Sequence, residues 1–321
     1  MDNGETLPSG LALRLPSPLE ELRDDRLGEV RLFLKRDDLI HPELPGNKWR
    51  KLKHNLAEAA RQGKGTLLTF GGAHSNHIRA TAAAGHHFGL ATIGVIRGEE
   101  HLPLNPSLAY AASRGMRLTY LDRSTYRAKD SPEVIDRLRA EWGDFYLLPE
   151  GGGNAYAVRG CAELPAEIEA QLQAVAPGRA GGGPAFDVIC CACGTGCTLA
   201  GIASALPPGC RAVGFPVLKG GDYLAGEVER LQREAFGTPS QGWSLECGFH
   251  FGGYAKMTKE LAVFIEDFAV RHGETLDRIY VAKMMYGIFD LVSRGAFPPG
   301  ARLVAVVTGG PGPGQGSGGL A

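Results

Sequence analysis

The sequence predicts an α/β protein whose parallel-type sheets are covered by helices on both faces. Three features of the 321 residues predict this class. Short apolar β-rich runs alternate with helical stretches, apolar residues in a helical stretch recur at spacings of three and four, and the length suits one large or two modest domains. Alternating strands and helices imply a parallel sheet, because each helix returns the chain to the edge where the strand began.

The expected elements can be followed along the chain. Strands are expected at residues 30–35, 66–70, 91–96, 117–121, 187–191, 212–217 and 303–307. A helix is expected from Lys48 to about Gln62, with an apolar seam made of Trp49, Leu52, Leu56 and Ala59. An alanine-rich helix is expected at residues 75–87. The glycine- and proline-rich segments 177–184 and 309–319 are expected to form a flexible loop and a disordered tail.

Composition excludes several classes of function. The formal net charge is −1, so no bulk basic field favours nucleic acid, and no run of about 18 apolar residues spans a bilayer. Residues 1–22 lack a basic segment followed by an apolar run, so no signal peptide is expected. The seven cysteines, four of them within residues 190–197, do not resemble a secreted disulfide framework. We expect a cytoplasmic protein that binds neither nucleic acid nor membrane.

A lysine stands at the start of the first long helix. Pro45-Gly46 indicates a turn, and Asn47 is expected to be the N-cap, which places Lys48 in the first helical turn. The partly positive helix N-terminus and the nearby charges of Arg50 and Lys51 should lower the pKa of Lys48. The neutral amine is the form needed for Schiff-base chemistry. Taken alone, the segment also fits a solvated basic helix start that meets an anion.

A polar turn follows the expected strand at residues 66–70. Gly71-Gly72 leads into a run of polar side chains, and parallel α/β sheets bind ligands outside the carboxyl ends of their strands. Ser75 and Asn76 can hydrogen-bond an anionic or phenolic ligand, although an N-cap with a solvated helix start is equally compatible. His74 and His77 suggest a metal pair, but the sequence offers too few further ligands, and no metal is expected.

A glycine loop follows the cysteine-rich strand. Gly194, Thr195, Gly196, Cys197 and Thr198 combine small residues, consecutive N–H groups and hydroxyls at a helix start, which suits a phosphate. No Gly-Lys-Ser/Thr follows, and Leu199 stands where a dinucleotide-binding loop needs glycine, so a monoester phosphate is favoured. A tight strand-to-helix turn remains the structural alternative.

The spacing of Cys190 and Cys193 is C-x-x-C, which allows a zinc or redox site. A second cysteine pair at structural-zinc spacing is missing, and the segment is typical of a core strand. Core packing is therefore the favoured interpretation.

Taken together, these segments resemble the 1-aminocyclopropane-1-carboxylate (ACC) deaminase/D-cysteine desulfhydrase family of pyridoxal-phosphate (PLP) enzymes. The resemblance runs from about residue 34 to 308. Its matching segments are 34–38, 46–51, 71–77, 149–152, 194–198, 280–287 and 308–310. It implies a two-domain α/β fold of the tryptophan synthase β type. The implied smaller domain is near 46–155 and the larger one comprises 1–45 plus 156–308, with PLP between them and residues 309–321 as a flexible tail.

The resemblance also implies roles for individual residues. Lys48 resembles the lysine that forms the Schiff base with PLP, with Lys51 as the second lysine of that motif. Asn76 resembles the residue that hydrogen-bonds the phenolic oxygen, and Ser75 the residue near the substrate carboxylate or reacting carbon. The loop at 194–198 resembles the phosphate loop. The substrate-facing tyrosines of the family correspond to Tyr254 and Tyr280.

One departure bears on the reaction. ACC deaminases have a glutamate facing the pyridine nitrogen directly after the tyrosine that matches Tyr280, and here that residue is Val281. Thr308 stands where desulfhydrase-type members place threonine, within reach of the nitrogen. We expect β-elimination from a small D-cysteine-like amino acid. The alternatives are an ACC deaminase, a PLP-binding protein without turnover and, more remotely, a Rossmann-type nucleotide binder. A homodimer is expected from the resemblance.

Overall fold

The computed structural model describes residues 11–44, 46–175 and 183–309. Residues 1–10, which begin the segment where no signal peptide is expected, lie outside these ranges, as do most of the expected loop at 177–184 and the expected tail after Gly309. None of the described helices combines the length and apolar character needed to cross a bilayer.

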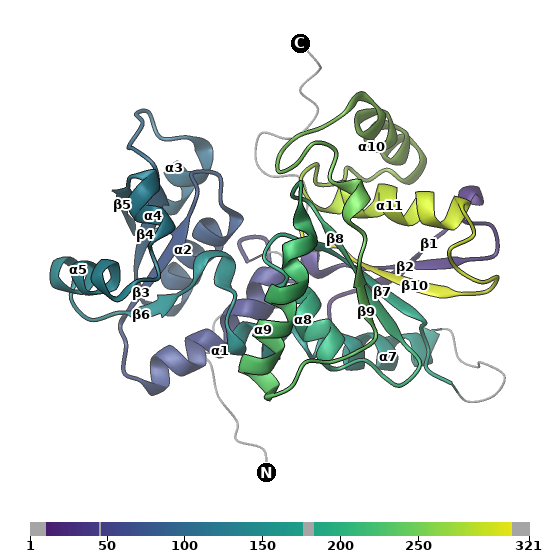
Figure 1. Cartoon of the computed structure of the whole chain (residues 1–321), viewed down its shortest axis with the longest axis horizontal. Coiled ribbons are helices and arrows are strands. Elements are labelled where there is room, and N and C mark those ends of the chain that lie inside the picture. Colours follow the sequence, from purple (N-terminus) through teal and green to yellow (C-terminus); the bar gives the residue numbers. More distant parts are fainter. Residues whose placement is uncertain (1–10, 45, 176–182, 310–321) are drawn as a thin grey trace.

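Among the described residues, the larger sheet has six strands in the order β1-β2-β10-β7-β8-β9 (Figure 1). They are β1 (Leu19–Leu22), β2 (Arg31–Lys35), β10 (Arg302–Val306), β7 (Val188–Cys193), β8 (Arg211–Pro216) and β9 (Trp243–Leu245). Only β1 runs antiparallel to its neighbour within this described sheet. Because β10 pairs with both β2 and β7, the sheet joins strands from both ends of the chain.

Helices cover both faces of this sheet, as expected for parallel strands. On one face lie α10 (Lys259–His272) and α11 (Val281–Ser293). On the other lie α6 (Ala155–Cys161), α7 (Leu164–Val175), α8 (Cys197–Ser204) and α9 (Leu224–Phe236). Alternate residues of each strand therefore enter different cores.

The smaller described sheet is parallel throughout, in the order β5-β4-β3-β6. Its strands are β3 (Thr66–Gly71), β4 (Ala91–Arg97), β5 (Met116–Leu121) and β6 (Tyr146–Leu148). One face packs on α1 (Asn47–Arg61), α2 (Asn76–Phe88) and α3 (Pro106–Ser113), and the other on α4 (Arg123–Arg127) and α5 (Pro132–Trp142). Short 3-10 helices are η1 (Asp25–Leu27), η2 (Asp37–Leu39), η3 (Glu150–Gly152), η4 (Gly221–Tyr223) and η5 (Cys247–Phe249).

The predicted α/β class is confirmed, and each expected strand is present to within two residues of its expected bounds. The short strands β1, β6 and β9 were not expected, because three or four residues carry too little periodicity. One sheet falls in each expected domain, but the boundaries near residues 46 and 155 stay a prediction. Helices α1 and α6 pack closely across them, with the carbonyl of Arg50 against Gly160.

The cysteine-rich strand is a core strand. Cys190 belongs to the core shared with α11, whereas Cys193 belongs to the core on the opposite face. Side chains three residues apart on a strand point to opposite faces, so this pair cannot share a zinc ion or a disulfide. Within the described ranges, no group of three or more His, Cys, Asp or Glu side chains is placed to hold a metal.

A buried ion cluster ties α1 to the larger sheet. The guanidinium of Arg50 donates to Asp37 of η2 at 2.7 and 2.8 Å and to Glu167 of α7 at 3.0 Å. Lys35 of β2 also donates to Glu167, at 2.5 Å. Burial acts to raise the pKa of Glu167, but hydrogen bonds and charge from Arg50 and Lys35 outweigh it and lower this pKa to about 2.

Glu167 should therefore make the stability depend on pH. Its pKa is about 2 in the folded chain against 4.5 unpaired, so its stabilisation is full above about pH 4.5 and is lost as pH falls toward 2. We expect Glu167→Gln to lower the free energy of unfolding by roughly 2 kcal/mol at pH 6, with the difference from the unsubstituted protein shrinking by pH 3. Urea unfolding at several pH values measures both.

Glu229→Gln is the matched control, because Glu229 pairs with Arg233 on an exposed surface of α9. It should change the free energy of unfolding by less than about 0.5 kcal/mol at either pH. A Glu167→Gln difference that stays constant from pH 6 to pH 3 would contradict the ion-cluster interpretation.

Candidate active site

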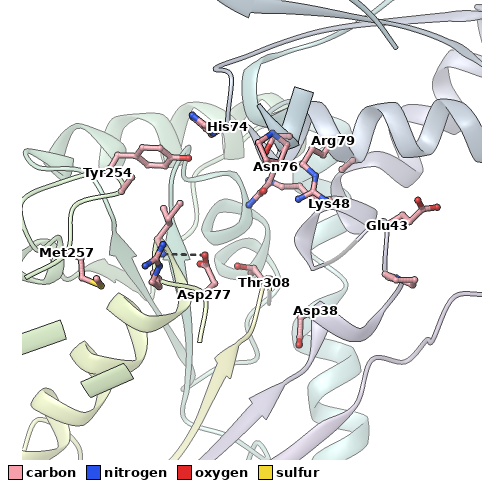
Figure 2. Close-up of a pocket in the computed structure, with 18 of the residues that line it drawn as sticks. Asp38, Glu43, Lys48, His74, Asn76, Arg79, Tyr254, Met257, Asp277 and Thr308 are labelled. Atoms are coloured by element: carbon pink, nitrogen blue, oxygen red, sulfur yellow. Dashed lines mark hydrogen bonds between the residues drawn. The ribbon is translucent and has the colours of Figure 1, made fainter. Parts of the chain in front are cut away.

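Two adjoining cavities of about 600 and 490 Å³ lie where strands of both sheets end. Residues common to both are Lys48, His74, Asn76, Tyr254, Asp277, Thr308 and Gly309. Figure 2 shows Lys48, Asn76 and Arg79 gathered on one side, facing Asp277, Thr308 and Tyr254. The carboxyl ends of parallel strands are the usual binding crevice of such folds, so these cavities form the candidate site.

Lys48 lies in the first turn of α1 and lines both cavities. Burial lowers the pKa of its amine to about 7, and the charge of Lys51 adds to this effect. Arg50, which we expected to contribute, is neutralised by its carboxylate partners, so that part of the prediction is wrong. A fully solvated basic helix start is not what the structure shows, because Lys48 is half-buried and lines both cavities.

The expected N-cap at Asn47 is wrong. Asn47 is already helical, and the cap position belongs to Gly46, which has φ of +63° and makes no side-chain cap. A Cβ on Gly46 would stand 1.7 Å from the carbonyl oxygen of Thr308, so only glycine allows this contact. Asn47 instead donates to the hydroxyl of Thr198 at 2.9 Å. The start of α1 is thus joined to two other predicted site residues.

The glycine loop turns from β7 into α8. Gly196 has φ of +74°, and the N–H groups of Gly194, Thr195 and Gly196 donate to no backbone carbonyl of the described chain. Together with the free N–H groups at the start of α8, they form a cup able to accept an anion. The side chain of Cys197 is fully buried, although the residue lines the smaller cavity, and hydrogen bonding with Cys161 lowers the pKa of its thiol.

The polar turn after β3 serves two purposes. Ser75 is the N-cap of α2 and accepts from the N–H groups of His77 and Ile78, which confirms the capping alternative. Its hydroxyl proton remains available to a ligand, and Asn76 beside it lines both cavities. His77 is buried and bonded to Thr69 at 2.9 Å, with a pKa lowered by burial and then by the charges of Lys48 and Lys51.

The two expected tyrosines meet at the cavity. The ring of Tyr254 stands edge-on to that of Tyr280, with 6.1 Å between centroids. Burial raises the pKa of the Tyr280 phenol, and Tyr254 raises it further, so this phenol stays protonated. Val281 does not face the cavities, because its side chain is fully buried in the core beneath α11.

Asp277 and Arg79 also line the site and were not expected from the sequence. Asp277 accepts the N–H groups of Tyr280 and Val281 at 2.7 and 3.1 Å, and burial raises its pKa. Asp277 stands four residues before the first residue of α11, and an acidic residue that caps the turn leading into a helix is a recognisable pattern that could have identified it. Arg79 stacks on Tyr110 with its Nε unbonded among described residues, and nothing in its sequence context marks it.

Comparison with known proteins agrees with this geometry. The family model described as "Pyridoxal-phosphate dependent enzyme" matches residues 12–309. The chain belongs to this family. PLP is therefore the cofactor of the enzyme, and the observed features fit it: an amine with a lowered pKa and an anion cup opening on the same cavity.

Relatives within the family carry two activities in their names. A Pyrococcus horikoshii protein provisionally named a 1-aminocyclopropane-1-carboxylate deaminase is 32% identical over 292 residues, covering 87% of this chain and 84% of that protein. A D-cysteine desulfhydrase of Yersinia pestis (strain Pestoides F) is 30% identical over 314 residues, covering 92% and 91%. A solved structure described as an ACC deaminase homologue superposes with a TM-score of 0.77 at 28% identity, covering 93% and 90%.

We propose how the PLP-dependent enzyme holds its cofactor. Lys48 would bond to the aldehyde carbon, and the cup at Gly194–Thr198 would accept the phosphate. Asn76 would donate to the phenolic oxygen, and Thr308 would reach the ring nitrogen. Lys51 donates to the carbonyl of Gly151 at 3.3 Å and would act through its charge alone.

A reconstitution experiment should distinguish the role of Lys48 from that of Lys51. When PLP is removed and added back, the visible band of the lysine-bound cofactor should form faster as pH rises through about 7, where the amine of Lys48 becomes neutral. Lys48→Ala should form no band. Lys51→Ala should form it with a midpoint roughly half a pH unit higher, because a neighbouring positive charge is lost. A band in Lys48→Ala but not in Lys51→Ala reverses the assignment.

The loop can be tested with a matched glycine. Gly196→Ala should weaken PLP binding about tenfold or more, because a Cβ is strained at φ of +74° and would stand 3.0 Å from Val228. Gly209→Ala is the control, since it has the same strain at φ of +86° with open space around it. Cys197→Ser should bind PLP nearly as well as the parent. PLP titration reports affinity, and thermal unfolding reports general damage; equal PLP affinities in all three variants would make the loop only a turn.

Proposed function

We propose that this PLP-dependent enzyme is a lyase that eliminates the β-substituent of a small D-cysteine-like amino acid. The observation that carries the proposal is the residue pair Val281 and Thr308. Valine has no carboxylate, so Val281, whose side chain is buried in the core, cannot offer one to the ring nitrogen. Thr308 lines both cavities and offers a hydroxyl. The nearby carboxylate of Asp277 is already occupied by backbone N–H groups.

A hydroxyl at the ring nitrogen suits elimination better than ring opening. Bound PLP supplies an electron sink, whose depth depends on whether the ring nitrogen is protonated. A carboxylate keeps that nitrogen protonated, whereas a threonine hydroxyl leaves it largely neutral. Cleaving a cyclopropane ring needs the deeper sink, and expelling a thiol from a β-carbon needs less.

The residues around the cavity supply the groups that must accept and donate protons in this reaction. Lys48 can take a proton from Cα at Nζ, because its pKa of about 7 leaves much of the amine neutral near neutral pH. Tyr280 keeps its phenolic proton and can donate it toward a leaving sulfur. Ser75 retains a hydroxyl proton for the substrate carboxylate. In the net reaction the Cα–H and Cβ–S bonds break, and D-cysteine plus water yields pyruvate, ammonium and hydrogen sulfide.

The wider setting follows from the sequence. We propose a cytoplasmic enzyme that binds neither nucleic acid nor membrane, in line with the absence of disulfides among its seven cysteines, all of which lie in the described ranges. A homodimer is proposed from the family resemblance.

Substrate preference tests this function directly. We expect kcat/KM for pyruvate release from D-cysteine to exceed by at least about tenfold that for 2-oxobutanoate release from ACC, because Val281 removes the carboxylate. Steady-state assays with D-cysteine, L-cysteine and ACC measure this. Lys48→Ala provides the background rate.

Three outcomes decide between the alternatives. A higher kcat/KM for ACC makes the protein an ACC deaminase and overturns the argument from Val281 and Thr308. A visible PLP band without keto-acid release from any amino acid indicates a binding protein. Faster turnover of L-cysteine would retain β-elimination but reverse the expected chirality.

A further inference from the structure

A buried lysine holds the backbone of a loop at the cavity. Lys283 lies in the first turn of α11, and its side chain is fully buried. Its ammonium donates to the carbonyl oxygens of Gly253 at 2.7 Å and His250 at 2.8 Å, with a longer contact to Val217 at 3.5 Å. Among the described residues it forms no ion pair, so its ligands are backbone carbonyls.

Burying the ammonium of Lys283 costs free energy of desolvation, which an apolar side chain at the same position would not. An ammonium removed from water is expensive unless its protons are satisfied, and burial lowers the pKa of Lys283 to about 8 despite the opposing charge of Asp277. An apolar side chain would fill the same space without that cost. What the lysine provides in return is hydrogen bonds to three backbone carbonyls, two of which belong to one short loop.

That loop has a backbone which is unfavourable by itself. Phe251 and Ala255 have φ of 51° and 55°, which is the left-handed region that side chains with a Cβ rarely occupy. Gly252 and Gly253 also have positive φ, and few hydrogen bonds within the loop hold it, among them Gly253 N–H to His250 at 3.0 Å. The two carbonyl bonds from Lys283 therefore supply much of the order.

Tyr254 projects from this loop between the strained positions. Its ring stands edge-on to Tyr280, which directly precedes α11, and 42% of Tyr254 is exposed to the cavity and solvent. Figure 2 shows Tyr254 reaching across the cavity above Asp277. The start of α11 thus carries Tyr280 and also, through Lys283, the loop that carries Tyr254.

We propose that Lys283 is a positioning residue that sets Tyr254 against Tyr280 by holding the carbonyls of His250 and Gly253. Lys283 itself lines neither cavity, so it acts through the loop. The contribution of Tyr254 to turnover rests on the function proposed above, whereas the ordering of the loop does not.

Hydrogen exchange of the PLP-loaded protein tests the ordering of the loop without any substrate. In Lys283→Met, the amides of residues 250–256 should exchange about tenfold faster, because the methionine has no donor for the carbonyls. Lys35→Met is the matched control: it removes another buried lysine, one bonded to Ser17 and Glu167, and should leave exchange in this loop unchanged. Unchanged exchange in folded Lys283→Met overturns the proposal.

A double-mutant cycle with Tyr254→Phe tests the effect on turnover. We expect Lys283→Met to reduce kcat for β-elimination about tenfold in the parent, with little change in KM, but less than about twofold when Tyr254 is already phenylalanine. Equal losses in both backgrounds would mean a general structural role and would overturn the positioning role. Lys35→Met should instead combine additively with Tyr254→Phe.

Lys283→Gln keeps the test decisive if the methionine variant does not fold. Its amide retains two N–H donors. The exchange rates of residues 250–256 and the value of kcat should therefore lie between those of the parent and those expected for Lys283→Met. Glutamine is shorter than lysine, so we expect it to lose one of the two carbonyl contacts. Exchange rates and a kcat equal to those of the parent would therefore contradict the proposal. If no amino acid is turned over, the proposed function fails, and hydrogen exchange alone still decides the role of Lys283.

Discussion

The guanidinium of Arg50 ties the start of α1 to the larger sheet, and the geometry of the site depends on this interaction. Asp37 and Glu167 come from η2 and α7, so the ion cluster joins segments more than a hundred residues apart in sequence. Removing one partner of a buried pair leaves a charge without compensation, which makes such a cluster selective for one arrangement of its elements. Lys48 lies two residues before Arg50 and is placed by the same helix.

Two further contacts, one of backbone and one of side chains, position the start of α1. Gly46 brings the turn before α1 against the carbonyl of Thr308, and Asn47 bonds to Thr198 at the start of α8. Lys48, the loop proposed to hold the phosphate and the residue proposed for the ring nitrogen are therefore connected through the short stretch that opens α1. Because this stretch is also covered by protein, the amine of Lys48 loses hydration, and its pKa falls to about 7.

The opposite wall of the cavity is organised around the start of α11. Asp277 accepts the N–H groups that precede and open this helix, which fixes the backbone at Tyr280. Lys283, one turn further along, holds the loop that carries Tyr254. Buried charges thus order both walls of the cavity. Side-chain carboxylates pair with the buried charge at one wall, and backbone groups do so at the other. The phenol of Tyr280 keeps its proton, whereas the amine of Lys48 loses its proton more readily than an exposed lysine.

The sequence by itself determined the α/β class, the seven longer strands and the helices that begin near Lys48 and Ser75, because periodicity and turn residues act locally. It also pointed to Lys48 and the glycine loop, whose roles remain proposals. Only the tertiary structure decided that Asn47 bridges to Thr198, that Arg50 is neutralised, that Val281 faces the core and that Asp277 and Arg79 line the cavity. Each of these depends on contacts between distant segments, which local sequence patterns do not encode.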